Sequence, residues 1–417
     1  MKFKWAVCGM SLLAVLLPAV SVALPLDTAV ERALARDAGL NELAQRSRAL
    51  DHQAVADRSL PDPEVTIGAE GLPINDPFSA DMMTMYKIGI RQRFPAGDSR
   101  QLSAERSSTL ARALDAEAQA RMLEVTLQTR LAWLAWVSAH ESASVVTAMT
   151  DHLEELVALT QRRFAAGTGR LQDETQARLE LSLLERRVLD AQTAVDEARA
   201  RLKRWTGPLQ AGGPEYPLPE WSLALAGPSD SDARIARNPQ LAAANQRVEA
   251  GEIGTDLARQ SYRPQWMIEA GYGHQRGSAP MGGRMSDKLF AMATFSLPLF
   301  TANRQDRRVD AALAQRDAAE AGLWLTRQRL SGELDQHTAV LARLHERQAL
   351  LEDSILPQAR AVVDATASAY QSDRASFDEL IRARLRQLEM ELDLINTRER
   401  LLATIARIAA LTNEEPS

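Results

Sequence analysis

The stretch LQDETQARLELSLLERRVLDAQTAVDEARARLKRW, residues 171–205, decides the fold, because its apolar side chains recur at alternating spacings of three and four. They are Leu181, Leu184, Val188, Ala191, Val195, Ala198, Leu202 and Trp205. This period of 3.5 residues is typical of a helix that packs lengthwise against another helix. The same seam returns 206 residues later as Met390, Leu394, Thr397, Leu401, Thr404, Ile408 and Leu411. The chain is therefore predicted to contain two coiled-coil helical hairpins.

Other markers repeat at almost the same offset. Pro61 matches Pro264 and Pro95 matches Pro298 at 203 residues, whereas Phe164 matches Tyr370 and Leu171 matches Phe377 at 206 residues. The change of offset places three additional residues in the long helix of the second copy. A repeat of this kind indicates one supersecondary unit that is used twice.

The repeat predicts the organisation of the chain. Residues 1–23 form a signal peptide, and a first repeat follows at 24–207, with a strand hairpin at 61–95 and long helices at 98–207. A proline-rich linker at 208–230 leads to a second repeat at 231–413, which has a strand hairpin at 264–299 and long helices at 303–412. Residues 414–417 form a tail. A shorter helix is expected to open each repeat, at 27–59 and at 230–261. Because proline breaks helices, a kink is expected near Pro357.

The first residues have the features of a secretory signal peptide. Two lysines lie within the first four residues, an apolar stretch runs to about residue 20, and Ser-Val-Ala at 21–23 fits a cleavage site before Leu24. An uncleaved anchor helix is the alternative. The single cysteine, Cys8, lies in this segment, so the mature protein is expected to have no disulfide, thiolate chemistry or N-terminal lipid.

The composition and the motifs of the chain exclude several classes of function. The 417 residues are 45% hydrophobic and only 5% aromatic, and the net charge is −6. These values favour long helices and speak against a general nucleic-acid binder. The sequence has no phosphate-binding loop, helical His/Glu metal pair or nucleophile elbow, so we expect neither an enzyme nor a cofactor. After residue 23 no run of 18 apolar residues occurs, so any membrane span is expected to consist of strands.

Both hairpins alternate apolar and polar residues. The apolar sets are Val65, Ile67 and Ala69 with Tyr86, Ile88 and Ile90, and Trp266, Ile268, Ala270 and Tyr272 with Leu289, Ala291, Ala293, Phe295 and Leu297. A barrel strand between lipid and water needs one apolar and one polar face. Four strands cannot enclose a lumen, whereas twelve strands from three chains can. A four-stranded sheet in a soluble protein is the alternative.

The repeated order of strand hairpin, long helix, tight turn and heptad helix, with a proline-rich linker between the copies, resembles the TolC-like outer-membrane factors of Gram-negative efflux systems. The matching motifs are Asn238-Pro-Gln-Leu241, Ser296-Leu-Pro-Leu-Phe300 before Asn303-Arg304, Phe94-Pro-Ala-Gly97 with Arg100, Phe164-Ala-Ala-Gly167, and Tyr370 before Phe377-Asp-Glu-Leu380. Two departures are that Tyr370-Gln-Ser-Asp373 lacks the usual turn glycine, and that Ile381 stands where some members have a second acidic residue.

The resemblance implies a mainly α chain with internally duplicated coiled-coil hairpins and two β-hairpins. Three such chains would form a twelve-stranded barrel in the outer membrane and an α-barrel in the periplasm. Members of the family dock with a periplasmic adaptor and an inner-membrane pump of the RND type. The expected role is therefore that of an efflux duct.

The turns between the paired helices hold the candidate functional residues. An acidic ring at the periplasmic aperture would favour cations, and Asp378 is its first candidate, with Glu379 and Asp373 as alternatives. A carboxylate that stabilises a helix start is the other interpretation of Asp378. The residues expected to contact the adaptor are Gly167, Thr168, Gly169, Arg170, Ser372 and Arg374.

Methionines in the hairpin segments bear on the cargo. Met82, Met83, Met85, Met281 and Met285 are the candidate metal ligands, and Met267 and Met292 lie in the strands. Thioether sulfur suits Cu(I), and the segment from Gly71-Leu-Pro73 through Met82-Met-Thr-Met85 to Gln92-Arg-Phe-Pro95 resembles the heavy-metal branch of the family. Apolar filling of lipid-facing or loop positions is the alternative. The favoured cargo is a metal cation such as copper, silver, cobalt, zinc or cadmium; drug efflux, type I protein secretion and a periplasmic coiled-coil adaptor or scaffold are the other functions considered.

Overall fold

The computed structural model describes residues 24–75, 83–209, 212–214, 218–222, 231–276, 282–283 and 285–416. The signal peptide predicted at 1–23 and parts of the linker predicted at 208–230 lie outside these residues. The chain divides into two compact units. The first comprises residues 1–36, 128–220 and 348–400, and the second comprises 37–127, 221–347 and 401–417.

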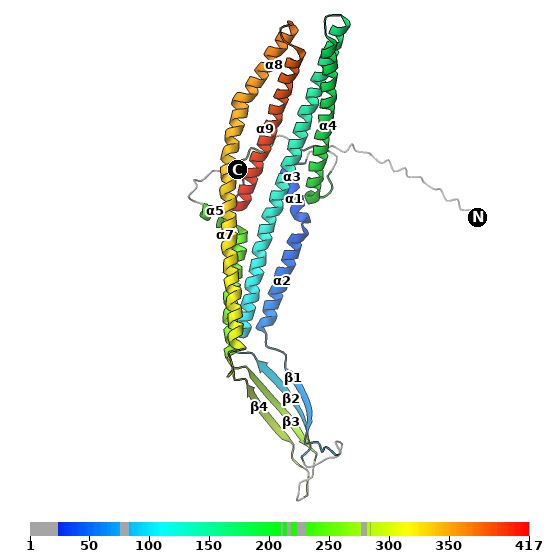
Figure 1. Cartoon of the computed structure of the whole chain (residues 1–417). Coiled ribbons are helices and arrows are strands. Elements are labelled where there is room, and N and C mark those ends of the chain that lie inside the picture. The colour runs from blue at the N-terminus through cyan, green and yellow to red at the C-terminus, as the bar shows by residue number, and fades with distance from the viewer. Residues whose placement is uncertain are drawn as a thin grey trace, which may run out of the picture. The chain divides into compact units, whose positions relative to one another are not determined.

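The first unit is built from helices. They are α1 (Leu26–Arg36), the later part of α3 (Ser99–Ala165), α4 (Leu171–Thr206), α8 (Leu356–Gln371) and most of α9 (Phe377–Thr412). In Figure 1, α4 lies alongside α3 and α9 lies alongside α8, so that each pair is a helical hairpin. The predicted seam is the covered side of α4: Leu184 and Leu202 are buried, whereas Leu183 and Leu189, which lie off the seam, are exposed.

A hydrophobic core joins the two hairpins of this unit. It consists of Val146, Leu153 and Val157 of α3, Ala177 and Leu184 of α4, Tyr370 of α8, and Phe377, Leu380, Ile381 and Leu388 of α9. A fully buried side chain of this size stabilises a fold by about 1.5–3 kcal/mol, so the cluster holds the hairpins together. Ile381 is 3% exposed, which explains why this position carries an apolar rather than a second acidic residue.

Leu24, the expected first mature residue, is fixed within the first unit. The indole Nε1–H of buried Trp133 donates to the Leu24 carbonyl at 3.0 Å. Leu24 also forms a parallel bridge with Pro214 of the linker. Because a buried indole N–H needs an acceptor, this hydrogen bond anchors the start of the described chain to α3.

The second long helix is interrupted where a kink was predicted. α7 (Gln305–Leu350) is followed by a π-helical turn at Leu351–Ile355, and Pro357 lies in the first turn of α8. Proline has no N–H to donate to the preceding turn, and a π turn accommodates such a break. Glu352 in this turn accepts hydrogen bonds from Arg398 Nη2 and Gln348 Nε2, both at 2.9 Å. The single helix expected to start at 303 is therefore two helices joined by a π turn.

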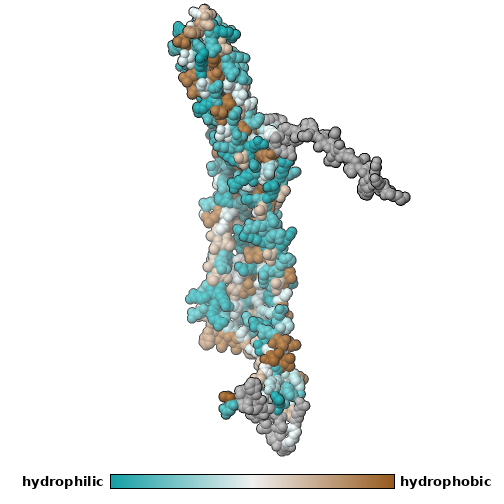
Figure 2. Space-filling model, turned by 90° about the vertical axis from the view of Figure 1, so that its right-hand side faces the viewer, coloured by the Kyte–Doolittle hydropathy of each residue, from teal (hydrophilic) through white to brown (hydrophobic). Residues whose placement is uncertain are grey.

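The second unit contains the shorter helices α2 (Ala38–Arg58), α5 (Ser231–Ile235) and α6 (Pro239–Arg259), with a 3-10 turn at Gln260–Tyr262. It also contains the early part of α3, most of α7 and the end of α9. Figure 2 shows one side of the molecule, on which hydrophilic residues predominate over the helices and hydrophobic residues form smaller patches between them. Across the described residues, none of the helices combines the length and the apolar character needed to cross a membrane.

The expectation of one continuous helix at 27–59 and at 230–261 was wrong. The first is broken at Asp37, whose carboxylate accepts the N–H of Leu40 at 2.9 Å and caps α2. The second is broken at Asn238, which accepts the N–H of Gln240 at 2.9 Å and donates to the Leu411 carbonyl at 2.9 Å. Asp and Asn are preferred caps because they satisfy the free N–H groups of a helix start.

The strands form one sheet in the order β1-β2-β3-β4, with every neighbouring pair antiparallel. They are β1 (Glu64–Glu70), β2 (Met85–Phe94), β3 (Trp266–Gln275) and β4 (Lys288–Phe295). The two predicted hairpins therefore pair directly through β2 and β3, although these strands come from different repeats. The prediction of a mainly α chain with a small antiparallel strand part is confirmed.

One face of the sheet is apolar and exposed. Ile67, Ile88, Tyr272 and Leu289 are cross-strand partners in one row, and their exposed fractions are 81%, 52%, 40% and 86%. Large apolar side chains at this exposure are costly in water. The predicted alternation is thus present, and in the described chain no other element covers the apolar face.

The opposite face is polar and has a hydrogen-bonded centre. Glu269 is 7% exposed and accepts hydrogen bonds from Thr66 Oγ1 at 2.9 Å and from Arg91 Nη2 at 2.9 Å. These contacts link β1, β2 and β3 through a single carboxylate. A buried carboxylate with an arginine partner fixes the register in which the hairpins pair, because a shift of one residue would move it to the apolar face.

Candidate functional site

The turn that joins α3 to α4 and the turn that joins α8 to α9 have the same hydrogen-bond pattern. The N–H of Thr168 donates to the carbonyl of Arg163 at 3.0 Å, and the N–H of Arg374 donates to the carbonyl of Ala369 at 2.8 Å. In both turns the next N–H donates to the same carbonyl. The corresponding atoms are 206 residues apart, which is the offset of the heptad seams.

Gly167 and Asp373 occupy the same place in these two turns. Both adopt the left-handed conformation, with φ of 71° and 55°. Glycine adopts it without a steric penalty, and Asp and Asn are the other residues that tolerate it. In the second turn, which lacks the usual glycine, Asp373 therefore adopts the same left-handed backbone conformation that Gly167 adopts in the first turn.

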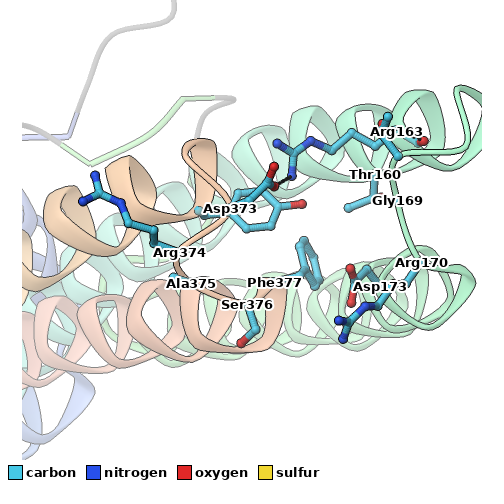
Figure 3. Close-up of a pocket in the computed structure, with 12 residues that line it drawn as sticks. Thr160, Arg163, Gly169, Arg170, Asp173, Asp373, Arg374, Ala375, Ser376 and Phe377 are labelled. Atoms are coloured by element: carbon cyan, nitrogen blue, oxygen red, sulfur yellow. Dashed lines mark hydrogen bonds and ion pairs between the residues drawn. The ribbon is translucent and has the colours of Figure 1, made fainter.

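A cavity of about 420 Å³ lies between the two turns, and Figure 3 shows its lining. Five predicted residues line it: Thr168, Gly169, Arg170, Asp373 and Arg374. The other lining residues are Thr160, Arg163, Asp173, Tyr370, Ala375, Ser376 and Phe377. The structure thus brings together turns that are some 200 residues apart in the sequence.

Arg163 connects the two hairpins across this cavity. Its Nη1 lies 3.2 Å from Asp373 Oδ1, and its guanidinium carbon lies 5.0 Å from the centre of the Tyr370 ring. The Tyr370 ring meets the Phe377 ring edge-on, with centres 6.1 Å apart. Burial raises the pKa of Tyr370 above its ordinary value; Arg163 opposes this shift, and the nearby carboxylates of Asp173 and Asp373 add to it. Tyr370 therefore stays a neutral phenol at physiological pH.

Glu379 belongs to a capping box at the start of α9. Its carboxylate accepts the backbone N–H of Ser376 at 2.7 Å and the Ser376 hydroxyl at 3.0 Å, and its own N–H donates to that hydroxyl at 3.2 Å. The Ser376 N–H, and then its hydroxyl, hold the pKa of Glu379 below its ordinary value. This aperture candidate is therefore engaged in capping its own helix.

Asp173 stands at the equivalent position of α4, but its carboxylate is not engaged in this way. The residue that caps α4 is Arg170, which makes no side-chain cap. Within the part of the chain that the structure describes, the Asp173 carboxylate accepts no hydrogen bond and forms no ion pair. It lies in the first turn of α4, where a negative charge is favourable, and lines the cavity together with Arg163 and Arg170.

Asp378, the first aperture candidate, lies on α9 and is half-exposed. Its carboxylate accepts a hydrogen bond from Gln176 Nε2 of α4 at 2.9 Å and forms an ion pair with Arg382, one helical turn further on. Because Arg382 balances the charge of Asp378, a ring of three such carboxylates would have a weaker field than three bare ones.

Of the candidate metal ligands, Met83, Met85 and Met285 are described, and they lie at or close to strand ends. Met82 and Met281 are outside the described residues, Met83 is exposed, and Met85 and Met285 are half-buried. The strand register places Met85 opposite Glu70, which puts it on the polar face together with Met267 and Met292. No group of three His, Cys, Asp or Glu side chains is arranged to hold a metal ion in the described ranges.

Sequence reasoning did not identify Arg163 or Asp173 as site residues. The repeat offset contained a signal for Asp173, because it aligns with Glu379, which was a candidate. Arg163 had no such signal, since its role depends on how the two hairpins pack.

Comparison with known proteins agrees with this architecture. The family model for outer membrane efflux proteins matches residues 29–208 and 231–414. Fusaric acid resistance protein FusA of Burkholderia cepacia is 28% identical over 218 residues, which are 51% of this chain and 41% of FusA. The matched part thus spans about two fifths of the length of that relative.

Solved outer-membrane channels share the fold. VceC of Vibrio cholerae is 19% identical, with a TM-score of 0.76 and coverage of 93% of this chain and 96% of VceC. CusC is 14% identical, with a TM-score of 0.80 and coverage of 94% and 93%. OprN is 19% identical, with a TM-score of 0.78 and coverage of 94% and 90%.

The two helical hairpins and the four-stranded sheet are thus the fold that these outer-membrane channels share. The chain belongs to the outer membrane efflux protein family. The predicted resemblance to the TolC-like outer-membrane factors is confirmed.

Proposed function

We propose that this chain is the outer-membrane duct of a tripartite efflux system and that it works as a homotrimer. The main support for this proposal is the sheet. In the described chain its outer strands β1 and β4 each have an unpaired edge, and its apolar face is exposed. Three copies joined edge to edge would pair all edges in a twelve-stranded barrel. The apolar face would meet lipid, and the face with Glu269 would line the lumen.

The interhelical turns are the proposed periplasmic end of the duct. They would form the aperture and dock a periplasmic adaptor, which in turn recruits an inner-membrane pump of the RND type. The cavity with its charged rim supports this role, because it is a polar recess between two exposed turns. Asp378 remains the proposed aperture residue, with Arg382 as its charge partner.

Heavy-metal cations are the proposed cargo. Met85, Met267 and Met292 lie on the polar face of the sheet, where they would face the lumen rather than lipid. Thioether ligands of this kind suit soft cations such as Cu(I) or Ag(I). Export of small organic compounds is the second candidate, because the FusA relative is named for resistance to fusaric acid.

A deletion strain tests both parts of this proposal. Loss of the chain should sensitise cells to copper, silver, zinc or cobalt, and the intact gene should restore resistance. Hypersensitivity to organic compounds alone would reject the metal cargo and retain the duct. Purified protein that is monomeric and does not conduct in planar bilayers would reject the duct itself.

A further inference from the structure

We propose that Met267 and Met292 together form a binding site for a soft monovalent cation, Cu(I) or Ag(I), on the polar face of the sheet. This inference deepens the proposed function and rests on it, because that face would line the lumen of the duct. It assigns the cation to one pair of thioether side chains.

The methionines of the four strands all lie on the polar face of the sheet. They are Met85, Met267 and Met292. The branched aliphatic residues of these strands all lie on the opposite face, which contains no methionine in the described strands; they are Val65, Ile67, Ile88, Ile90, Ile268 and Leu289. If methionine only filled apolar space, it would be expected on the apolar face as well. The segregation therefore points to a role for thioether sulfur on the face that meets water.

Packing accounts for two of the apolar side chains on the polar face. A Cβ atom added to Gly271 would lie 2.5 Å from Cζ of Phe290, so the Phe290 ring covers this glycine. A Cβ atom added to Gly273 would lie 2.6 Å from Sδ of Met85, so Met85 covers that glycine. Phe290 and Met85 thus fill the space that the two glycines leave, and no ligand is needed to explain them.

Met267 and Met292 do not cover a glycine in this way. The cross-strand partners of Met267 are Arg93 and Thr294, and the partner of Met292 is Glu269. Met292 is 52% exposed and Met267 is half-buried. Both thioethers are therefore accessible from the polar face, and a packing role does not explain their presence there.

The strand register brings the two side chains together. Met267 of β3 lies opposite Thr294 of β4, and Met292 lies two residues from Thr294 on the same strand. Met267 and Met292 are thus diagonal neighbours on one face, and such neighbours are about 7–8 Å apart, within reach of long side chains. Because methionine has three rotatable bonds, the two sulfur atoms can turn toward a shared ion.

The chemistry of the pair favours a soft cation with a single charge. Thioethers are neutral, soft ligands, which suit Cu(I) and Ag(I) rather than hard cations such as Mg²⁺ or Ca²⁺. Glu269, the carboxylate opposite Met292, already accepts hydrogen bonds from Arg91 and Thr66, so it adds little free charge for a divalent ion. Two neutral ligands would also release the ion again, as passage through a duct requires.

Methyl NMR of the mature protein in detergent tests this site, with Ag(I) as the probe. The methionine methyl groups would carry ¹³C, and each resonance would be assigned by its loss in a Met→Leu variant. We expect the methyls of Met267 and Met292 to shift with one common midpoint. M292L should abolish the shift of the Met267 methyl in that range, and M267L that of the Met292 methyl. Leucine keeps the volume of methionine, so both variants should fold.

Met122 provides the matched control. It lies on α3, outside the sheet, and is 42% exposed. Its methyl should shift only at higher concentrations of Ag(I), and M122L should leave the common midpoint of Met267 and Met292 unchanged. Mg²⁺ should shift none of these methyls, because it binds oxygen ligands.

The outcomes separate this inference from the proposed cargo. Independent shifts of the Met267 and Met292 methyls, or no shift of either, would overturn the shared site. Shifts of Met122, Met267 and Met292 at the same concentration would indicate an adventitious ion only and would overturn it as well. The deletion strain decides the cargo independently: sensitivity to silver or copper without a shared site would retain metal export through other residues.

Discussion

Asp373 takes in the second interhelical turn the left-handed position that Gly167 takes in the first, with φ of 55° and 71°. Glycine is also replaced at the ends of α4 and α9, where Gly207 corresponds to Asn413; both have a positive φ, 78° and 54°, although the ψ of Gly207 is −162°. Asp373 and Asn413 are the non-glycine residues with positive φ in the described chain. The second repeat thus uses Asp and Asn where the first repeat uses glycine.

Substitutions at Asp373 should reveal the cost of this conformation. Asp373→Val should destabilise the tip by about 1–2 kcal/mol, because a β-branched residue fits the left-handed region poorly. Asp373→Gly should change stability by less than about 1 kcal/mol, since relief of strain offsets the exposed ion pair with Arg163. Apparent unfolding midpoints in detergent would measure both, with Gly167→Val as the matched change in the first turn. Equal effects of valine and glycine at 373 would refute the conformational argument.

Stability in acid should depend on Asp37. The side-chain hydrogen bond from Arg121, whose Nη2 lies 2.7 Å from Asp37 Oδ2, is the main reason why the pKa of Asp37 is below its ordinary value. A group with a lowered folded pKa contributes stability above its unfolded pKa of about 3.9, and this contribution is lost as the pH falls through the folded pKa. Asp37→Asn keeps the helix cap and should cost about 1–2 kcal/mol at pH 7.

The pH profile distinguishes this pair from general acid unfolding. The difference between wild type and Asp37→Asn should shrink as the pH falls below about 4, because the carboxylate binds a proton in the unfolded chain before it does so in the folded one. Asp51→Asn, an exposed change on the same helix α2, should show no such convergence. A constant difference between wild type and Asp37→Asn down to pH 2 would contradict the assignment.

Conductance should report on the pair of Asp378 and Arg382, if these residues line the proposed aperture. Asp378→Ala should raise single-channel conductance or remove block by divalent cations. Arg382→Ala leaves the Asp378 carboxylate without its cationic partner and should increase selectivity for cations. Arg386→Ala removes an exposed arginine one turn further on and serves as the control. Unchanged conductance and block in Asp378→Ala would rule out its gating role.

The register of α8 places its apolar side chains in the core. Insertion of one alanine between Arg360 and Ala361 would rotate the rest of α8 by about 100°, because this part of the helix is regular. Val363 and Tyr370, which are 1% and 5% exposed, would then leave the core. The loss should reach several kcal/mol and lower the unfolding midpoint and protease resistance of the hairpin. Deletion of Ser354 is the control, because the π turn Leu351–Ile355 holds one residue more than an α-helical turn, so that its shortening keeps the faces of α8. An insertion that behaves like this deletion would refute the role of the register.

The sequence predicted a helix correctly where the apolar heptad spacing continued without interruption. The seam predicted from Met390 to Leu411 lies within the single helix α9, Phe377–Thr412, because this stretch contains neither proline nor glycine. The breaks at Asp37 and Asn238 did not follow from the apolar spacing, because a single capping residue can end one helix and start the next. The π turn was located only as a kink, since proline indicates where a helix changes but not how.

Contacts between distant segments could not be predicted in the same way. Alternation predicted each hairpin, but the pairing of β2 with β3 joins residues such as Arg91 and Glu269 from different repeats. Among the residues that line the cavity between the two turns, those in the turns themselves were predicted from their motifs. Arg163 was not, because its contacts with Asp373 and Tyr370 arise only when the two hairpins pack.

The difference between Gly167 and Asp373 also has a consequence for the symmetry of any assembly. A trimer of this chain would display six turns, with glycine-type and aspartate-type turns alternating around the axis. A partner ring of six identical subunits would meet two chemically distinct surfaces in alternation. Its subunits would then have to bind as two inequivalent sets, so that the partner experiences threefold rather than sixfold symmetry.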